Sequence, residues 1–121
     1  MNDSPAESQF NGVITEIRMY RIKAGRGEEF LRCFDTSVAP LLRSKGIAVV
    51  GPFCDIENGD TIVWLRTFPS LEDRERMLDD FYASDEWRSG LKEITGDLIE
   101  DQSHAIVLLP ARVLSDRRDI E

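Results

Sequence analysis

In IAVVGPFCDIENGDTIVWLRTF, residues 47–68, an Asn-Gly pair lies between two β-rich runs, and this arrangement is the strongest indication of the fold. Ile47 to Ile56 and Thr61 to Phe68 are rich in β-branched and aromatic residues, which favour strands. Asn58-Gly59 is a strong hairpin signal, because both central residues of a type I′ turn need positive φ. We therefore predict two antiparallel, neighbouring strands joined by this turn.

Upstream of the hairpin, the sequence predicts one more strand and one helix. Val13 to Ile22 alternates in the manner of a strand, and Lys23-Ala24-Gly25 breaks it. Apolar residues then recur at helical spacing until Gly46, although Pro40 predicts a kink or an early end near Ala39. The apolar positions of this helix are Phe30, Leu31, Phe34, Val38, Leu41 and Leu42.

Downstream, Ser70 with Asp73 three residues later has the pattern of a helix start. Ser84 reads as a second cap, so the helical region is expected to be broken in two. Ser103 to Leu109 is the last predicted strand, and Pro110 closes it. The positions expected to be buried in this helical region are Leu71, Met77, Leu78, Phe81, Trp87, Leu91, Ile94 and Leu98.

The predicted fold is α+β, a ferredoxin-like β-α-β-β-α-β domain over residues 13–110 with an antiparallel four-stranded sheet. Polar tails, residues 1–12 and 111–121, flank it. Right-handed crossovers place both helices on one side of the sheet, leaving the other side bare. We expect a homodimer to cover that face as an α/β-barrel, because apolar side chains there would drive association. The side chains assigned to the bare face are Ile14, Tyr20, Ile22, Trp64, Phe68, Ile106 and Leu108.

Composition limits the possible partners of this chain. Its net charge of −8 opposes binding to nucleic acid or to an anionic membrane surface. No apolar run is long enough to cross a membrane, and Met1 to Gly12 lacks the pattern of a signal peptide, so a cytoplasmic location is expected. Cys33 and Cys54 have no CxxC spacing, and no phosphate-binding or metal-binding motif is visible. We therefore expect neither a cofactor nor a metal.

Several segments together resemble the NIPSNAP family between about Val13 and Pro110. They are Glu16-Ile-Arg18-Met-Tyr20, Lys23-Ala-Gly25, Ile62-Val-Trp64-Leu-Arg66, Ser70-Leu-Glu-Asp-Arg74, Asp85-Glu-Trp87 and Leu108-Leu-Pro110. The chain departs from the family at Ala24, where a proline is common. The resemblance implies a dimeric α/β-barrel. It also implies a binding or adaptor role, as described for members of the family, and no agreed catalytic motif.

A polar cluster is expected on the two central strands. Alternation places Glu16, Arg18 and Tyr20 on one face of their strand, and strand adjacency places Trp64 and Arg66 beside them. His104 is expected to share this face through its alternation with Ile106 and Leu108. These side chains predict a small-molecule pocket, with Arg18, Tyr20, Trp64 and Arg66 as the ligand-binding candidates. The arginines would favour an anionic or carbonyl-bearing ligand.

Three interpretations of this cluster stay open at the level of sequence. The first is a small-molecule-binding dimer without catalysis. The second is a cofactor-independent enzyme of the monooxygenase, isomerase or cyclase type, acting on a small carbonyl or aromatic compound with Glu16 or His104 as its general base. The third is structural: Glu16 pairs with Arg18 or Arg66 and fixes the strand register or the dimer interface.

Overall fold

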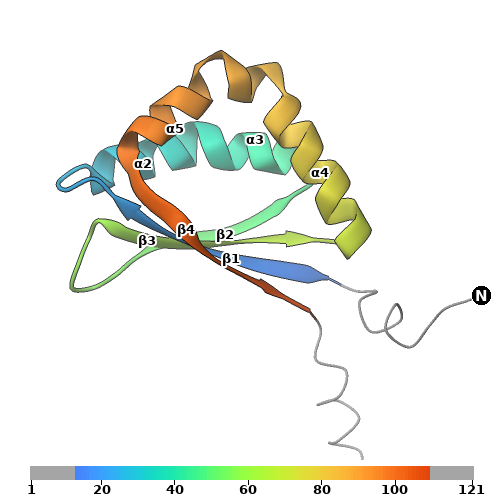
Figure 1. Cartoon of the computed structure of the whole chain (residues 1–121), viewed down its shortest axis with the longest axis horizontal. Coiled ribbons are helices and arrows are strands. Elements are labelled where there is room, and N and C mark those ends of the chain that lie inside the picture. Colours follow the sequence, from blue (N-terminus) through green and yellow to red (C-terminus); the bar gives the residue numbers. More distant parts are fainter. Residues whose placement is uncertain (1–12, 110–121) are drawn as a thin grey trace, which may run out of the picture.

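The computed structural model describes residues 13–109 and contains one four-stranded sheet with helices (Figure 1). The tails predicted at 1–12 and 111–121, with Pro110, lie outside the described residues. In chain order the elements are β1 (Ile14–Ile22), α2 (Gly27–Cys33), a π-helical turn (Phe34–Val38), α3 (Ala39–Ser44), β2 (Ala48–Cys54), β3 (Thr61–Phe68), α4 (Leu71–Ala83), a second π-helical turn (Trp87–Leu91), α5 (Lys92–Leu98) and β4 (Ile99–Leu108).

The sheet has the strand order β2-β3-β1-β4, and all three strand pairs are antiparallel. This order confirms the predicted β-α-β-β-α-β topology, with β1 and β3 in the centre. Figure 1 shows α2, α3, α4 and α5 on one side of the sheet, as right-handed crossovers require. No helix within residues 13–109 is long and apolar enough to cross a membrane.

The side chains of β1 and β3 that we predicted on the bare face lie instead on the face that the helices cover. Trp64 packs on Phe34, with ring centroids 4.8 Å apart, and Tyr20 packs on Phe30 at 5.8 Å. The even-numbered residues of both strands thus face the helices and form the core instead of the bare face. Alternation separates two faces of a strand but does not say which one the helices cover. The corrected residues are Ile14, Tyr20, Ile22, Trp64 and Phe68.

No element of residues 13–109 covers the opposite face of the sheet (Figure 1). Most side chains on that face are apolar. Ile106 and Leu108 do lie on it, as predicted, and Ile106 is 56% exposed. By the register of the three strand pairs, this uncovered face includes Thr15, Ile17, Met19, Ala48, Val50, Phe53, Val63, Leu65, Thr67, His104, Ile106 and Leu108.

The predicted hairpin between β2 and β3 forms, but its turn is not type I′. No non-glycine residue in the described chain has positive φ, and Gly59 does not have it either. The loop closes instead through side chains: Asn58 Oδ1 accepts from the N–H of Asp60 at 3.0 Å, and Asp55 Oδ1 accepts from Glu57 at 2.9 Å. These Asx-type contacts stabilise a longer connection than a two-residue turn.

The helices follow the predicted spacing with two local differences. Pro40 does not end the first helical region, which continues from Gly27 to Ser44; it directly follows the π-helical turn Phe34–Val38, a local irregularity at which a helix can accommodate a proline. The break after α4 is confirmed, and Ser84 Oγ accepts from the N–H of Trp87 at 3.3 Å. Leu71 and Ile94, which we expected to be buried, are 42% and 52% exposed.

β4 begins at Ile99, four residues earlier than predicted. The segment from Glu100 to Gln102 is polar and has no strand signal of its own. Its conformation comes from pairing with β1, where Ile22 lies opposite Ile99 and Arg21 lies opposite Asp101.

Candidate functional site

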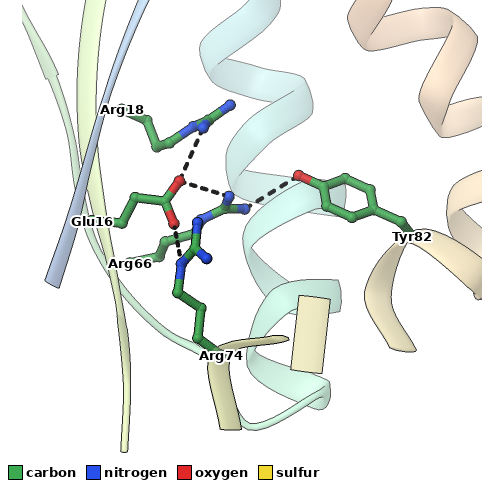
Figure 2. A network of polar contacts seen from close by, with 5 residues as sticks. All are labelled: Glu16, Arg18, Arg66, Arg74 and Tyr82. Atoms are coloured by element: carbon green, nitrogen blue, oxygen red, sulfur yellow. Dashed lines mark hydrogen bonds and ion pairs between the residues drawn. The ribbon is translucent and has the colours of Figure 1, made fainter. Parts of the chain in front are cut away.

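A buried carboxylate, Glu16 on β1, is surrounded by three guanidinium groups (Figure 2). Its side chain is only 1% exposed. Glu16 Oε2 accepts from Arg18 Nη1 and from Arg66 Nη2, each at 2.9 Å. Glu16 Oε1 accepts from Arg74 Nε at 3.1 Å. We call these four residues the Glu16 cluster.

The sheet register and one helix start bring the cluster together. Glu16 lies directly opposite Arg66 in the β1–β3 pair, and Arg18 is two residues along β1 on the same face. Arg74 comes from the first turns of α4, whose start is capped by Ser70 Oγ accepting from the N–H of Asp73 at 3.0 Å. The cluster therefore ties α4 to the two central strands. The pairing of Glu16 with Arg18 and Arg66 was one of the alternatives left open by the sequence, whereas the contact with α4 was not predicted.

The protonation of Glu16 is set by two opposing effects. Burial raises the pKa of its carboxyl group. The hydrogen bond and charge of Arg66, together with the charges of Arg18 and Arg74, lower this pKa by more than burial raises it. The net result is a pKa below the ordinary value of 4.5. For Arg66, burial lowers the pKa of the guanidinium group, but the hydrogen bond and charge of Glu16, together with the interactions with Tyr82, outweigh burial and raise that pKa above its ordinary value. Both groups are charged at neutral pH.

We expect Glu16 to make the protein acid-sensitive in a defined direction. Because its pKa is lower in the folded than in the unfolded state, its contribution to stability is fully present above 4.5 and is lost as pH falls through the folded-state value. Urea unfolding at a series of pH values from about 7 down to about 3 would measure this loss. Glu16→Gln should remove this part of the pH dependence, and an unchanged profile in that variant would contradict the assignment.

The Glu16 cluster carries more positive than negative charge. Three guanidinium groups face one carboxylate, so two positive charges remain, and no other described carboxylate lies within ion-pair distance of these arginines. Arg18 Nε and Arg66 Nε are buried without a hydrogen-bond partner among the described residues. Arg66 Nη1 also donates to the hydroxyl oxygen of Tyr82 on α4, at 3.3 Å. Figure 2 shows Tyr82 reaching toward the cluster from the helix layer.

A cavity of about 480 Å³ lies next to Tyr82, between the sheet and the helices. Six of the described lining residues are aromatic, and Lys92 is the only charged one among them. The indole Nε1–H of Trp64, which is 2% exposed, has no acceptor within residues 13–109. The lining residues are Tyr20, Phe30, Phe34, Val38, Trp64, Tyr82, Trp87, Lys92, Thr95, Gly96, Ile99 and Gln102.

The four ligand-binding candidates divide into two groups. Tyr20 and Trp64 line the cavity. Arg18 and Arg66 are bound to Glu16 and are not part of its described lining. Arg66 is connected to the cavity through Tyr82, and Arg18 lies 5.6 Å from the centre of the Tyr20 ring.

Neither candidate general base lies in the wall of the cavity. Glu16 already accepts three hydrogen bonds from arginines on its two oxygens. His104 shares the uncovered face of the sheet with Ile106 and Leu108, as predicted, but it lies opposite Met19 and not on the face of Glu16, so the expected sharing of one face by His104 and Glu16 is wrong. Its side chain is 66% exposed, and its ring nitrogen is 3.7 Å from Asp101. The register of β4, which the sequence left undetermined, decides this outcome.

Reasoning from strands alone missed the helical part of the site. Arg74 and Tyr82 of α4 complete the polar network, and Trp87 and Lys92 belong to the cavity wall. Arg74 belongs to one of the segments that resemble the NIPSNAP family, and this was the only signal for it. Its contact with Glu16 could not be predicted, because the two residues are 58 positions apart in the chain. No group of three or more potential metal ligands occurs in the described part of the chain, and Cys33 and Cys54 are free thiols.

Several solved structures have the same fold. A NIPSNAP family protein from Agrobacterium tumefaciens is 30% identical, with a TM-score of 0.72 over 84% of this chain and 90% of that one. An uncharacterized NIPSNAP domain protein from Burkholderia xenovorans is 20% identical, with a TM-score of 0.72 over 81% and 94%. A putative antibiotic biosynthesis monooxygenase from Bordetella bronchiseptica is 16% identical, with a TM-score of 0.64 over 83% and 98%, which shows a shared fold alone.

Two sequence comparisons complete the picture. Among the curated proteins, none matches the chain. The NIPSNAP family model matches residues 15–113, which is most of the chain and includes every residue of the Glu16 cluster. The protein therefore belongs to the NIPSNAP family.

Proposed function

We propose that this NIPSNAP protein is a cytoplasmic homodimer that binds a small molecule in the cavity between its sheet and its helices. The observation that carries the proposal is the cavity itself. Its volume of about 480 Å³ is in the range of small-molecule sites, and aromatic side chains form half of its described wall. Two free cysteines agree with a reducing compartment.

The polar groups of the wall support an anionic or carbonyl-bearing ligand. The N–H of Trp64 has no acceptor among the described residues, and a buried donor without a partner costs about 1–3 kcal/mol. A ligand oxygen or a bound water would remove that cost. Tyr20 and Trp64 are proposed to contact the ligand, while Arg18 and Arg66 act through their charge from behind the wall. The enzyme alternative has no comparable support, because neither Glu16 nor His104 reaches the cavity.

The homodimer is proposed to form through the uncovered face of the sheet. Its central side chains, among them Ile17, Met19, Val63 and Leu65, are apolar. Large exposed apolar patches drive association, and a second copy packed sheet on sheet is self-complementary to such a face. In this arrangement each protomer keeps its own cavity, because the cavity is on the helix side of the sheet.

Gly96→Phe is expected to fill the cavity and weaken ligand binding at least about tenfold. Gly96 is a wall residue on α5, and a Cβ atom at this position meets nothing within 4 Å, so a larger side chain has open space. Isothermal titration calorimetry with 2-naphthol, a bicyclic aromatic probe, would measure the affinity. The variant should fold at least as well as the wild type, because glycine is a poor helix former.

Gly96→Ala is the matched control for this experiment. It gives the same benefit to the helix but adds only one methyl group, so it should bind the probe nearly as tightly as the wild type. If the wild type does not bind 2-naphthol, or if Gly96→Phe binds it with unchanged affinity, the cavity is not the binding site and the proposal fails.

A further inference from the structure

The cavity is a positively charged region in a strongly acidic protein. The chain has a net charge of −8, yet Lys92 is the only charged residue among the described lining residues. Behind Tyr82, the Glu16 cluster adds two uncompensated positive charges. Charges in a partly buried site are screened less than charges on the surface, so they act on anything bound in the cavity.

The hydroxyl group of Tyr82 is held so that its proton is available to a ligand. Its oxygen accepts a hydrogen bond from Arg66 Nη1 at 3.3 Å. A guanidinium group has no acceptor, so the proton of Tyr82 cannot be directed back to Arg66. Tyr82 is 43% exposed and belongs to the cavity wall. The series of hydrogen bonds from Tyr82 through Arg66 to Glu16 therefore leaves the hydroxyl group of Tyr82 as a donor at the cavity.

Two further described wall residues supply donors, while Tyr20 and Gln102 can each donate and accept. Trp64 offers an unpartnered N–H, and Lys92 an ammonium group. The hydroxyl of Thr95 already donates to backbone oxygens of α5 and its preceding turn, so its proton is used. No aspartate or glutamate is among the described lining residues. The titratable groups that face a bound molecule are thus Tyr20, Tyr82 and Lys92, none of which is negatively charged at neutral pH.

We propose that the cavity selects planar acidic compounds, phenols or enols, and binds them as delocalised oxyanions whose oxygen accepts a hydrogen bond from Tyr82. This inference rests on the proposed small-molecule binding and specifies its ligand class. A wall of aromatic rings favours a flat ligand. An anion whose charge is spread over a ring system loses less hydration energy in such a wall than a compact anion does.

Binding of this kind involves proton loss but no covalent step. The ligand O–H bond breaks, its proton goes to bulk water, and the electron pair stays on the ligand oxygen. No bond to the protein forms, and nothing is oxidised or reduced. By linkage, a site that binds the anion more tightly than the neutral acid lowers the pKa of the bound ligand.

The test uses 4-nitrophenol, which ionises near neutral pH and whose anion absorbs visible light. Its absorbance is titrated against pH with and without saturating wild-type protein. We expect the anion to bind at least about tenfold more tightly than the neutral phenol, which lowers the pKa of the bound probe by about one unit. The neutral analogue 4-nitrobenzyl alcohol should bind more weakly at pH values where nitrophenol is ionised.

Three variants assign the effect to named groups. Tyr82→Phe removes the donor and Lys92→Gln removes the charge, and each should reduce the preference for the anion at least about threefold. Lys45→Gln removes a lysine that is not part of the described lining and should leave the preference unchanged. Thermal unfolding of each variant checks that the fold is intact.

The outcomes separate this inference from the proposed function. If 2-naphthol, a phenol that is not ionised at neutral pH, binds in a Gly96-dependent way but 4-nitrophenol does not bind, or binds with an unchanged or raised pKa, the proposed selection of oxyanions is wrong while the cavity remains a binding site. A lowered pKa that persists unchanged in both Tyr82→Phe and Lys92→Gln also overturns it. If neither probe binds, both proposals fail.

Discussion

Replacing Glu16 by glutamine is expected to lower the free energy of unfolding by about 3–5 kcal/mol, because it leaves three guanidinium groups buried or half-buried without a counter-charge. Glu16 is 1% exposed, and its partners Arg18 and Arg66 are 16% and 4% exposed, so water cannot take its place. Glutamine has nearly the same shape, and the loss therefore reports the charge. Urea unfolding at neutral pH would measure it.

Glu29→Gln provides the matched control for this substitution. Glu29 also pairs with an arginine, Arg26, at 2.9 Å, but its side chain is 53% exposed. Solvent screens such a pair, so this variant should have almost the same stability as the wild type. A double variant, Glu16→Gln with Arg74→Gln, should recover part of the loss because one unpaired charge disappears. Equal effects of Glu16→Gln and Glu29→Gln would show that the cluster does not hold α4 on the sheet.

Replacing Ile106 by glutamate is expected to convert the proposed homodimer into a monomer. Ile106 lies opposite Ile17 on the uncovered face, in the region that a second copy would cover. In a two-fold symmetric interface the substitution occurs twice, and each buried carboxylate without a partner costs several kcal/mol. We expect the dissociation constant to rise at least about a thousandfold. Analytical ultracentrifugation would show a shift from twice the chain mass to 13.8 kDa.

Ile94→Glu is a close control for the dimer experiment. Ile94 is 52% exposed and lies on α5 in the helix layer, whereas Ile106 is 56% exposed on the other side of the sheet. The two variants have the same chemistry and nearly the same exposure, so a difference between them locates the interface. A wild-type protein that stays monomeric at micromolar concentration, or a dimer that both variants leave intact, would contradict pairing through the sheet.

Much of the fold could be predicted because local signals agreed with one another. The alternation of β1, the apolar spacing around Phe34, the cap at Ser70 and the break at Ser84 all depend on neighbours close in sequence. The adjacency of β1 and β3 followed from chain connectivity and handedness, and it placed Glu16 beside Arg66 correctly. Asn58-Gly59 predicted the hairpin but not its turn, because the side chains of Asp55 and Asn58 offered the backbone another set of hydrogen bonds.

Alternation along each strand can be read from the sequence, and it correctly placed Glu16, Arg18, Trp64 and Arg66 on one shared face. Tertiary packing sets which face the helices cover, because both faces of β1 and β3 are apolar enough to be buried. It also decided the register of β4, which places His104 on the far side of the sheet from Glu16. Finally, the docking of α4 brought Arg74 and Tyr82 to the cluster. Those contacts join residues far apart in the chain. They could not be predicted, because packing between the helix layer and the sheet leaves no local pattern in the sequence.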